Sequence, residues 1–157
     1  MSKADMFLSL VGQRSGPIKG ESEDERHKDE IDIIGWSWGI GARKEMAGGG
    51  SAGKATIKEL SVLKHVDKAS TALMSVITTN ELITKAVLAV RKAGTTQQEY
   101  FKISIQKGRI TSLDVQASGP EMVESVTFAF QAIDVEYRLQ GEDGQLRGSQ
   151  LFSHEID

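Results

Sequence analysis

Apolar residues alternate with polar or small residues along most of this chain, and that spacing is the pattern of β-strands. Residues 6–11 are apolar on both faces, which is typical of a short strand covered on two sides, and a second short strand begins at Ile18. In residues 34–40 the large side chains share one face and small residues share the other. This pattern predicts a strand there, with Trp36 and Trp38 as structural core anchors.

The middle of the chain combines an ambiguous segment with a clearer helix. Residues 54–66 fit a helix in part and a strand in part, and we favour a strand that contains a bulge. Residues 67–79 place their apolar side chains on one helical stripe, with Asp67 or Ser70 able to cap the first turn. Asn80 is a suitable stop signal, so one helix is predicted here.

Beyond the helix the chain predicts a meander of antiparallel strands joined by short turns. The predicted segments are residues 83–91, 99–106, 110–117 and 123–139, with turns at Gly94, Gly108 and Gly119-Pro120. In the last segment the apolar parity reverses near Gln131 and Ala132, which indicates a bulge or a strand that bends between two sheets. We therefore predict one mainly β (α+β) domain over residues 1–157, with residues 141–157 as a candidate flexible tail.

Composition narrows the class of protein. The length of 157 residues is sufficient for one domain with a core, and the absence of cysteine excludes disulfides and thiolate metal sites. With 22 acidic and 19 basic residues, a net charge of -3 and no basic block, nucleic-acid binding is not expected. The apolar run at residues 6–11 is too short for a signal peptide or a membrane span. We expect a protein made soluble, with no membrane insertion and no cleavable signal.

A glycine-rich stretch is the most tempting candidate for chemistry. Gly48 to Ala55 reads GGGSAGKA and matches the P-loop spacing up to Lys54, but Ala55 stands where a P-loop has the Ser or Thr that holds magnesium. Charged residues precede the stretch and a predicted strand follows it, whereas a P-loop lies between a strand and a helix. The stretch also contains a formal G-x-S-x-G around Ser51, without the flanking elements of a nucleophile elbow. We interpret it as a surface loop and keep nucleotide binding through Gly48 to Lys54 as the alternative.

The histidines give no further candidate. His27, His65 and His154 lie far apart in the sequence, and their spacing fits no metal-binding motif. His27 falls within the strongly acidic residues 21–30, which we interpret as a solvated loop whose charges neutralise one another. No catalytic residue, metal or cofactor is predicted.

A series of short motifs nevertheless follows in order from Met6 to Tyr137. They are Gly20-Glu21-Ser22, Asp24, His27, Glu30-Ile31-Asp32, Trp36-Ser37-Trp38-Gly39, the glycine-rich loop, Asp67-Lys68-Ala69-Ser70, Arg91-Lys92-Ala93-Gly94, Tyr100, Glu124, Phe128 and Tyr137. Together they resemble the signature of the haemolysin-coregulated protein (Hcp) family of type VI secretion. The combination is far more specific than either short loop motif.

The resemblance implies a compact two-sheet antiparallel β-barrel with one α-helix packed against it, similar to phage tail-tube subunits, and a homohexameric ring. In that family the rings stack into a tube inside a contractile sheath, together with spike proteins. The tube is expelled from the cytoplasm into a target cell and can carry secreted effectors in its lumen. No residue performs covalent chemistry. A tail-tube subunit of another contractile injection system is the alternative within this class.

The glycine-rich loop acquires a different role in such an assembly. A long loop that extends from a barrel can contact the next ring of a tube. We therefore predict that residues 46–53 form part of the ring-stacking surface. The candidate residues are Met46, Gly48, Gly49, Gly50, Ser51 and Gly53.

Overall fold

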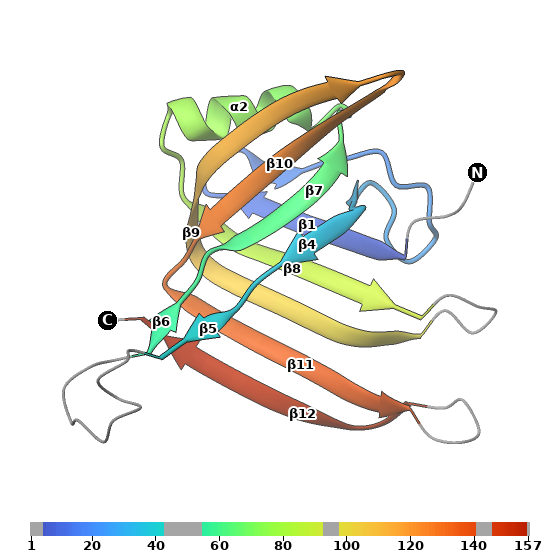
Figure 1. The fold of residues 1–157 in the computed structure, drawn as a ribbon, viewed down its shortest axis with the longest axis vertical. Coiled ribbons are helices and arrows are strands. Elements are labelled where there is room, and N and C mark those ends of the chain that lie inside the picture. The colour runs from blue at the N-terminus through green and yellow to red at the C-terminus, as the bar shows by residue number, and fades with distance from the viewer. Residues whose placement is uncertain (1–4, 43–54, 93–97, 141–145, 157) are drawn as a thin grey trace.

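The computed structural model describes residues 5–42, 55–92, 98–140 and 146–156. These residues form antiparallel strands in two main sheets with one helix beside them (Figure 1). The predicted class, a mainly β chain with two antiparallel sheets and a packed helix, is confirmed. The longest hydrogen-bonded path runs in the order β2-β1-β8-β9-β10-β7-β4, and it folds into two sheets because β9 belongs to both.

In the first sheet the N-terminal strand lies second from one edge. Its strands are β2 (Gly16–Ile18) and β3 (Ile31–Asp32) along one edge of β1 (Met6–Gly12), then β8 (Ile83–Arg91), β9 (Glu99–Ser118), β11 (Ala132–Gln140) and β12 (Leu146–Glu155). β8 has the bounds that its apolar pattern predicts. β1 also lies where the sequence places a strand, whereas β2 ends at Ile18, where the sequence pattern predicts that the second strand begins.

The second sheet is smaller and combines two strands that precede the helix in the sequence with two that follow it. It consists of the second half of β9, β10 (Glu121–Ala129), β7 (Leu60–His65) and β4 (Gly35–Ser37), while β5 (Ile40–Gly41) pairs with β6 (Thr56–Ile57) in a separate ribbon. The prediction of one strand over residues 34–40 is wrong, because β4 and β5 pair with different partners. The prediction of one bulged strand over residues 54–66 is also wrong, because β6 and β7 lie in different sheets, although the predicted parity break near Lys58 and Glu59 falls between them.

β9 passes from the first sheet to the second in one continuous strand, so the predicted turn at Gly108 is wrong. Its first half pairs with β8 and β11, and its second half pairs with β10. Lys107 has a φ of 53°, and a Cβ on Gly108 would lie 3.0 Å from the carbonyl oxygen of Ala129. The strand therefore bends at these two residues, and glycine allows the neighbouring backbone to approach.

The chain changes sheets at two further places. β10 lies in the second sheet and β11 in the first, which confirms the predicted change near Gln131. On the other side of the core, the Ile33 N–H donates to the Met6 carbonyl of β1 at 3.0 Å. The next residue, Ile34, donates its N–H to the Leu63 carbonyl of β7 at 2.8 Å. The two sheets are thus joined on both sides, although the first sheet is not closed at β12.

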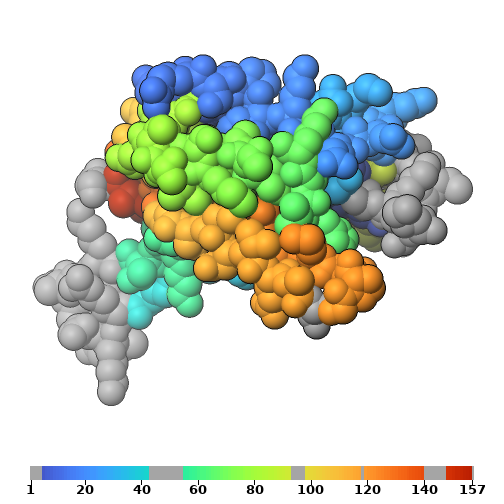
Figure 2. All heavy atoms as spheres, turned by 90° about the horizontal axis from the view of Figure 1, so that it is seen from above, coloured from blue at the N-terminus to red at the C-terminus, as the bar shows by residue number. Residues whose placement is uncertain are grey.

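α2 (Ser70–Thr78) packs against β9 within the predicted helical segment. Leu73 and Val76 are buried on its inner face. The N-cap residue is Ala69, so neither predicted capping residue holds that position. Asn80 follows the helix with a φ of 54°, a left-handed conformation that ends helices, as predicted. Figure 2 shows α2 at the surface, between the blue N-terminal strands and the amber and orange β9–β10 hairpin.

The apolar core fills the space between the sheets and the helix. Its fully buried side chains include Leu8, Ile31, Ile33, Leu60, Leu73, Ile83, Leu88, Ile103, Ile105 and Phe128. Trp36 and Trp38 are only partly buried and pack against this cluster from its margin. Trp36 stacks on Phe101 with ring centroids 5.5 Å apart, and Trp38 Nε1–H donates to the Lys58 carbonyl at 2.9 Å. The tryptophans therefore close one side of the core and do not form its centre.

The C-terminal segment contains a strand that the sequence pattern does not predict. Within residues 141–157, a candidate flexible tail, β12 pairs with β11 from Ala132↔Glu155 to Gln140↔Leu146. The backbone of β11 supplies the hydrogen-bonding partners, and these are independent of side-chain pattern. β11 and β12 together extend the first sheet beyond the core, at the lower end of Figure 1.

Candidate assembly surface

The β11–β12 hairpin, hereafter the wing, exposes apolar side chains. Tyr137 lies opposite Phe101 of β9, and Phe152 lies opposite Val135 of β11, so both continue the apolar inner face of the first sheet. That face is covered by the second sheet over the core, but both side chains on the wing are exposed. Leu139 is also exposed, at 55%. Ordinary surface apolar residues are scattered singly, whereas grouped ones mark interaction sites.

The wing also ends in a strand edge. Among the described residues β12 pairs only with β11, so its other edge presents backbone N–H and C=O groups. Leu151 lies on this strand and is 70% exposed. Such an edge can accept a strand from another chain, and proteins usually cover, charge or shorten it. An exposed edge beside exposed apolar side chains is the strongest structural sign of an interface in this molecule.

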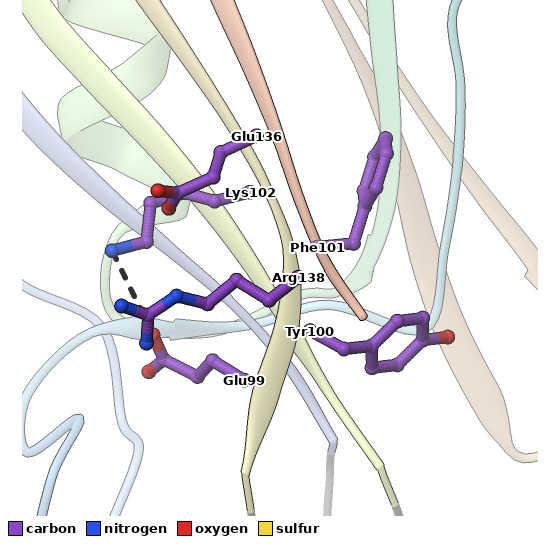
Figure 3. A pocket seen from close by; sticks show the side chains of 6 residues that line it. All are labelled: Glu99, Tyr100, Phe101, Lys102, Glu136 and Arg138. Carbon is purple, nitrogen blue, oxygen red and sulfur yellow. Dashed lines mark ion pairs between the residues drawn. The ribbon is translucent and has the colours of Figure 1, made fainter. Parts of the chain in front are cut away.

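The opposite face of the wing is charged and shallowly hollowed. A pocket of ≈ 120 Å³ is lined by Glu99, Tyr100, Phe101, Lys102, Glu136 and Arg138. Figure 3 shows that the four charged side chains point to one side of the sheet, whereas the two aromatic rings point away from them. Lys102 Nζ lies 3.7 Å from Glu99 Oε2. With acids and bases interspersed, this face suits polar contacts more than the recognition of one charged ligand.

Residues 21–30 cover the outer face of β1 and β8. The interpretation of this segment as a solvated loop is confirmed only in part, because five of its charged residues are exposed whereas Ser22 and His27 are buried. His27 is buried and stacks on Phe7, with ring centroids 4.3 Å apart. Its Nδ1 lies 2.9 Å from Glu30 Oε1, and its Nε2 lies 2.5 Å from Glu99 Oε1. The histidine therefore connects the loop to β1 through its ring and to β9 through Nε2, whereas its Nδ1 contacts Glu30 within the loop.

Arg91 is the second anchor of this loop. Its side chain is 1% exposed, its guanidinium lies over the Phe7 ring at 4.8 Å from the centroid, and it donates to Asp24 Oδ2 at 2.5 Å. This hydrogen bond lowers the pKa of Asp24 from 3.8 to about 2 and raises the pKa of Arg91. A buried arginine requires such a partner, and the acidic loop supplies it.

A second buried charged group lies beneath the start of α2. Lys64 of β7 and Glu124 of β10 have fully buried side chains, and Lys64 Nζ contacts Glu124 Oε1 directly. Lys64 Nζ also lies 2.8 Å from Asp67 Oδ1, and Ser70 Oγ donates to Glu124 Oε1 at 2.8 Å. The pair thus fixes the helix start to two neighbouring strands. Its position inside the core, without access to solvent, suits a structural role.

Among the described residues, no group of three or more histidines and acids could hold a metal ion. None of the helical residues described forms a segment long and apolar enough to cross a bilayer. The geometry thus directs attention to the wing and not to an internal site.

Comparison with known proteins identifies the family. The family described as type VI secretion system effector, Hcp, matches residues 7–137. The chain belongs to the Hcp family. Protein hcp1 of Pseudomonas aeruginosa is 37% identical over 149 residues, which cover 92% of this chain and 89% of the relative. The resemblance carried by the short motifs is therefore confirmed.

Solved Hcp-related structures share the fold over almost the whole chain. A type VI secretion system effector from Yersinia pestis is 27% identical, with a TM-score of 0.77 over 97% of this chain and 100% of that chain. Hcp1 from Salmonella typhimurium is 26% identical, with a TM-score of 0.77 over 97% of this chain and 95% of that chain. Both alignments extend past Tyr137 and include most of the C-terminal segment, which the motifs do not cover.

The Hcp motifs occupy structural positions in this chain. Asp24 and His27 hold the loop over Phe7, and Asp67, Ser70 and Glu124 meet beneath the helix. Among the motif residues that the structure describes, Tyr137 alone lies on the wing. Sequence reasoning included most of β11 in the predicted segment 123–139 but missed β12, where the few apolar residues are mixed with serine and histidine.

The glycine-rich loop lies outside the described residues, and so do the candidate stacking residues Met46, Gly48, Gly49, Gly50, Ser51 and Gly53. The chain enters this loop after β5 and leaves it into β6, at Thr56. A P-loop requires a helix at that position, because the helix N-terminus faces the phosphates. A strand there removes the structural basis for nucleotide binding through Gly48 to Lys54.

Proposed function

We propose that this chain is the ring subunit of a type VI secretion tube. It forms a homohexameric ring, the rings stack into a tube inside the contractile sheath and beneath the spike, and the tube is expelled from the cytoplasm without a cleavable signal. Effectors travel in the lumen. Membership of the Hcp family supports the class of function, and the wing is the observation in this chain that carries the assembly.

The wing supports assembly for a simple energetic reason. Burial of apolar surface contributes about 25 cal/mol per Å², so covering Tyr137, Leu139 and Phe152 with a second subunit stabilises the oligomer. A paired β12 edge would add backbone hydrogen bonds and remove a site of uncontrolled aggregation. Both contributions are lost in the isolated subunit.

The direct test is the oligomeric state of the purified protein. Light scattering should give a hexamer of the 17.1 kDa chain, and negative-stain images should show six-fold rings. Phe152→Lys should shift the protein toward monomers, because a lysine cannot be buried in an apolar contact without a partner. Thr71→Lys adds the same charge to the exposed surface of α2 and should leave the rings intact. A wild-type protein that remains monomeric at high concentration contradicts the proposed function.

The stacking role of residues 46–53 stays a prediction. Because β5 and β6 pair with each other, the loop can be shortened between them without removing a strand of either main sheet. Deletion of residues 46–53 should leave hexameric rings in light scattering but reduce tube length in negative-stain images. Lys54→Ala and Ser51→Ala keep the loop length and should leave tubes unchanged. Normal tubes from the deletion variant would exclude the loop from stacking.

A further inference from the structure

A second exposed apolar patch lies at the far end of the β9–β10 hairpin. It consists of Val66, Val115 and Met122, hereafter the tip patch, which are 38%, 46% and 51% exposed. The Val66 N–H donates to the Met122 carbonyl at 3.0 Å, and Val115 lies opposite Glu124, two residues from Met122. The three side chains therefore neighbour one another on one face of the second sheet.

The tip patch continues the core face of that sheet beyond the body. On β7 the inward side chains are Leu60, Val62 and Lys64, all buried, and the next position with the same parity is Val66. On β10 the buried Glu124 is followed toward the hairpin end by Met122. The start of α2 covers the Lys64–Glu124 row but not the residues beyond it. The core-facing side of β7 and β10 therefore stays apolar beyond the point where α2 covers it.

The wing and the tip patch lie at opposite ends of the molecule. Figure 1 shows the longest axis vertical, with the β9–β10 hairpin end at the top and β11–β12 at the bottom. Two different patches on opposite ends favour a heterologous contact, in which one patch of each copy meets the other patch of the next copy. A heterologous contact generates a ring when the rotation closes, whereas a contact of each patch with itself generates dimers.

We propose that the wing of one subunit binds the tip patch of the next subunit, head to tail around the ring. The inference rests on the proposed function, since it names the two surfaces that join the ring. Tyr137 and Phe152 of one copy cover Val115 and Met122 of its neighbour. Each subunit uses both ends once, so every copy in a closed ring is equivalent and neither patch remains exposed.

Charged side chains at the rims fit the same arrangement. Glu121 precedes Met122 at the tip, and its side chain is 71% exposed. Arg138 follows Tyr137 on the wing and is also exposed. An acid at one end and a base at the other favour unlike ends over like ends. A contact between two wings would bring together the Arg138 side chains of two subunits. A contact between two tip patches would likewise bring together two Glu121 side chains, and in both cases like charges repel.

The absence of native cysteine allows a direct test by thiol cross-linking. Met122→Cys and Tyr137→Cys are made as separate single variants and are co-expressed with different tags. Oxidation, or a short bismaleimide, should give a covalent dimer that contains both tags. Neither variant alone should give a covalent dimer, because like ends do not meet. The double variant should give a ladder of products up to the closed ring.

Matched controls lie on the opposite face of each sheet, on the strand paired with the one that carries the test cysteine. Gln116→Cys of β9 is the control for Met122→Cys of β10, and Ser149→Cys of β12 is the control for Tyr137→Cys of β11. Neither control should join with the cysteine at the other end. Val115→Cys is a second tip variant for the case in which Met122→Cys does not fold. Light scattering of each variant before cross-linking shows whether oligomers are present.

The outcomes separate the inference from the proposed function. Rings that cross-link in the co-expressed sample, but not in either single variant, support the wing-to-tip contact. Rings with no cross-link between the two ends, or with cross-links within each single variant, overturn the contact and leave the ring subunit proposal intact. A wild-type protein without rings overturns both.

Discussion

Charged side chains beneath α2 are buried, whereas apolar side chains on the wing are exposed. Under the helix, the subunit fully buries Lys64 and Glu124 and surrounds them with hydrogen-bonding partners. On the wing, it leaves Leu139 and Leu151 exposed to solvent. The rest of the subunit, hereafter the body, therefore buries even charged side chains within one chain. The wing, in contrast, leaves apolar side chains without a covering element. Substitutions in the body should change folding, and substitutions on the wing should change assembly.

The largest effect is expected from the buried charged pair. Lys64→Met leaves Glu124 fully buried without a basic partner, which should lower the free energy of unfolding by about 3–5 kcal/mol. The double variant Lys64→Met with Glu124→Leu should regain most of this loss, because no fully buried charge remains. His65→Ala, at the exposed neighbouring position, is the control and should change stability by less than about 0.5 kcal/mol. Urea unfolding of the four proteins measures the difference, and equal losses in the single and double variants would contradict it.

A smaller loss of stability is expected at the start of the acidic loop. A Cβ on Gly20 would lie 2.6 Å from the Glu30 carbonyl oxygen and 2.8 Å from the Ile31 Cα. Both atoms belong to the backbone, so Gly20→Ala forces the loop to shift and should cost roughly 1–3 kcal/mol. Gly148→Ala meets no atom within 4 Å and is the matched control in the wing. Thermal unfolding compares the two; equal melting temperatures would show that the loop adapts without cost.

The Asp24–Arg91 pair should make part of the body's stability depend on pH. The pKa of Asp24 falls from 3.8 to about 2 on folding, so the stabilisation is complete above about pH 4 and is lost as pH falls toward 2. Asp24→Asn should therefore cost roughly 1–2 kcal/mol at pH 7, less than the full value of about 1.36 kcal/mol per pKa unit because solvent screens the pair. Wild type and variant should converge only as the pH falls to about 2. A constant difference across that range would assign the stabilisation to another group.

The smallest effect on folding is expected from the wing. Leu139→Lys should change the unfolding free energy of the dilute subunit by less than about 0.5 kcal/mol, because the side chain is already exposed. The same substitution should shift the hexamer toward monomers in light scattering. Loss of folding stability without loss of assembly would reverse the contrast between the body and the wing.

The fold could be predicted in part because several elements carry their own signals. β8 and α2 each place apolar side chains with the period of one element, and their predicted positions are confirmed. The continuity of β9 through Gly108 could not be predicted, because it depends on β8 and β11 on one half and β10 on the other. A glycine such as Gly108 indicates a turn when no neighbouring strands pair on both sides of it, and a bend within a strand when they do.

The candidate assembly surface could not be predicted for a related reason. The pattern of apolar residues on Tyr137 and Phe152 is the same whether the chain itself or another copy covers them. Only the pairing of β11 with β12, and the absence of a covering strand over them among the described residues, distinguishes the two cases. The exposed edge of β12 likewise arises from the order of strands in space.

The sequence by itself determined the class and the family, because the helix, several strands and the ordered motifs are read from residue types and spacing. It also excluded disulfides, through the absence of cysteine. Tertiary structure alone decided that His27 and Arg91 are buried under an acidic loop, that Lys64 meets Glu124, and that the wing and the tip patch lie at opposite ends. Each of these depends on contacts between residues far apart in the chain, and local pattern carries no information about which distant groups meet.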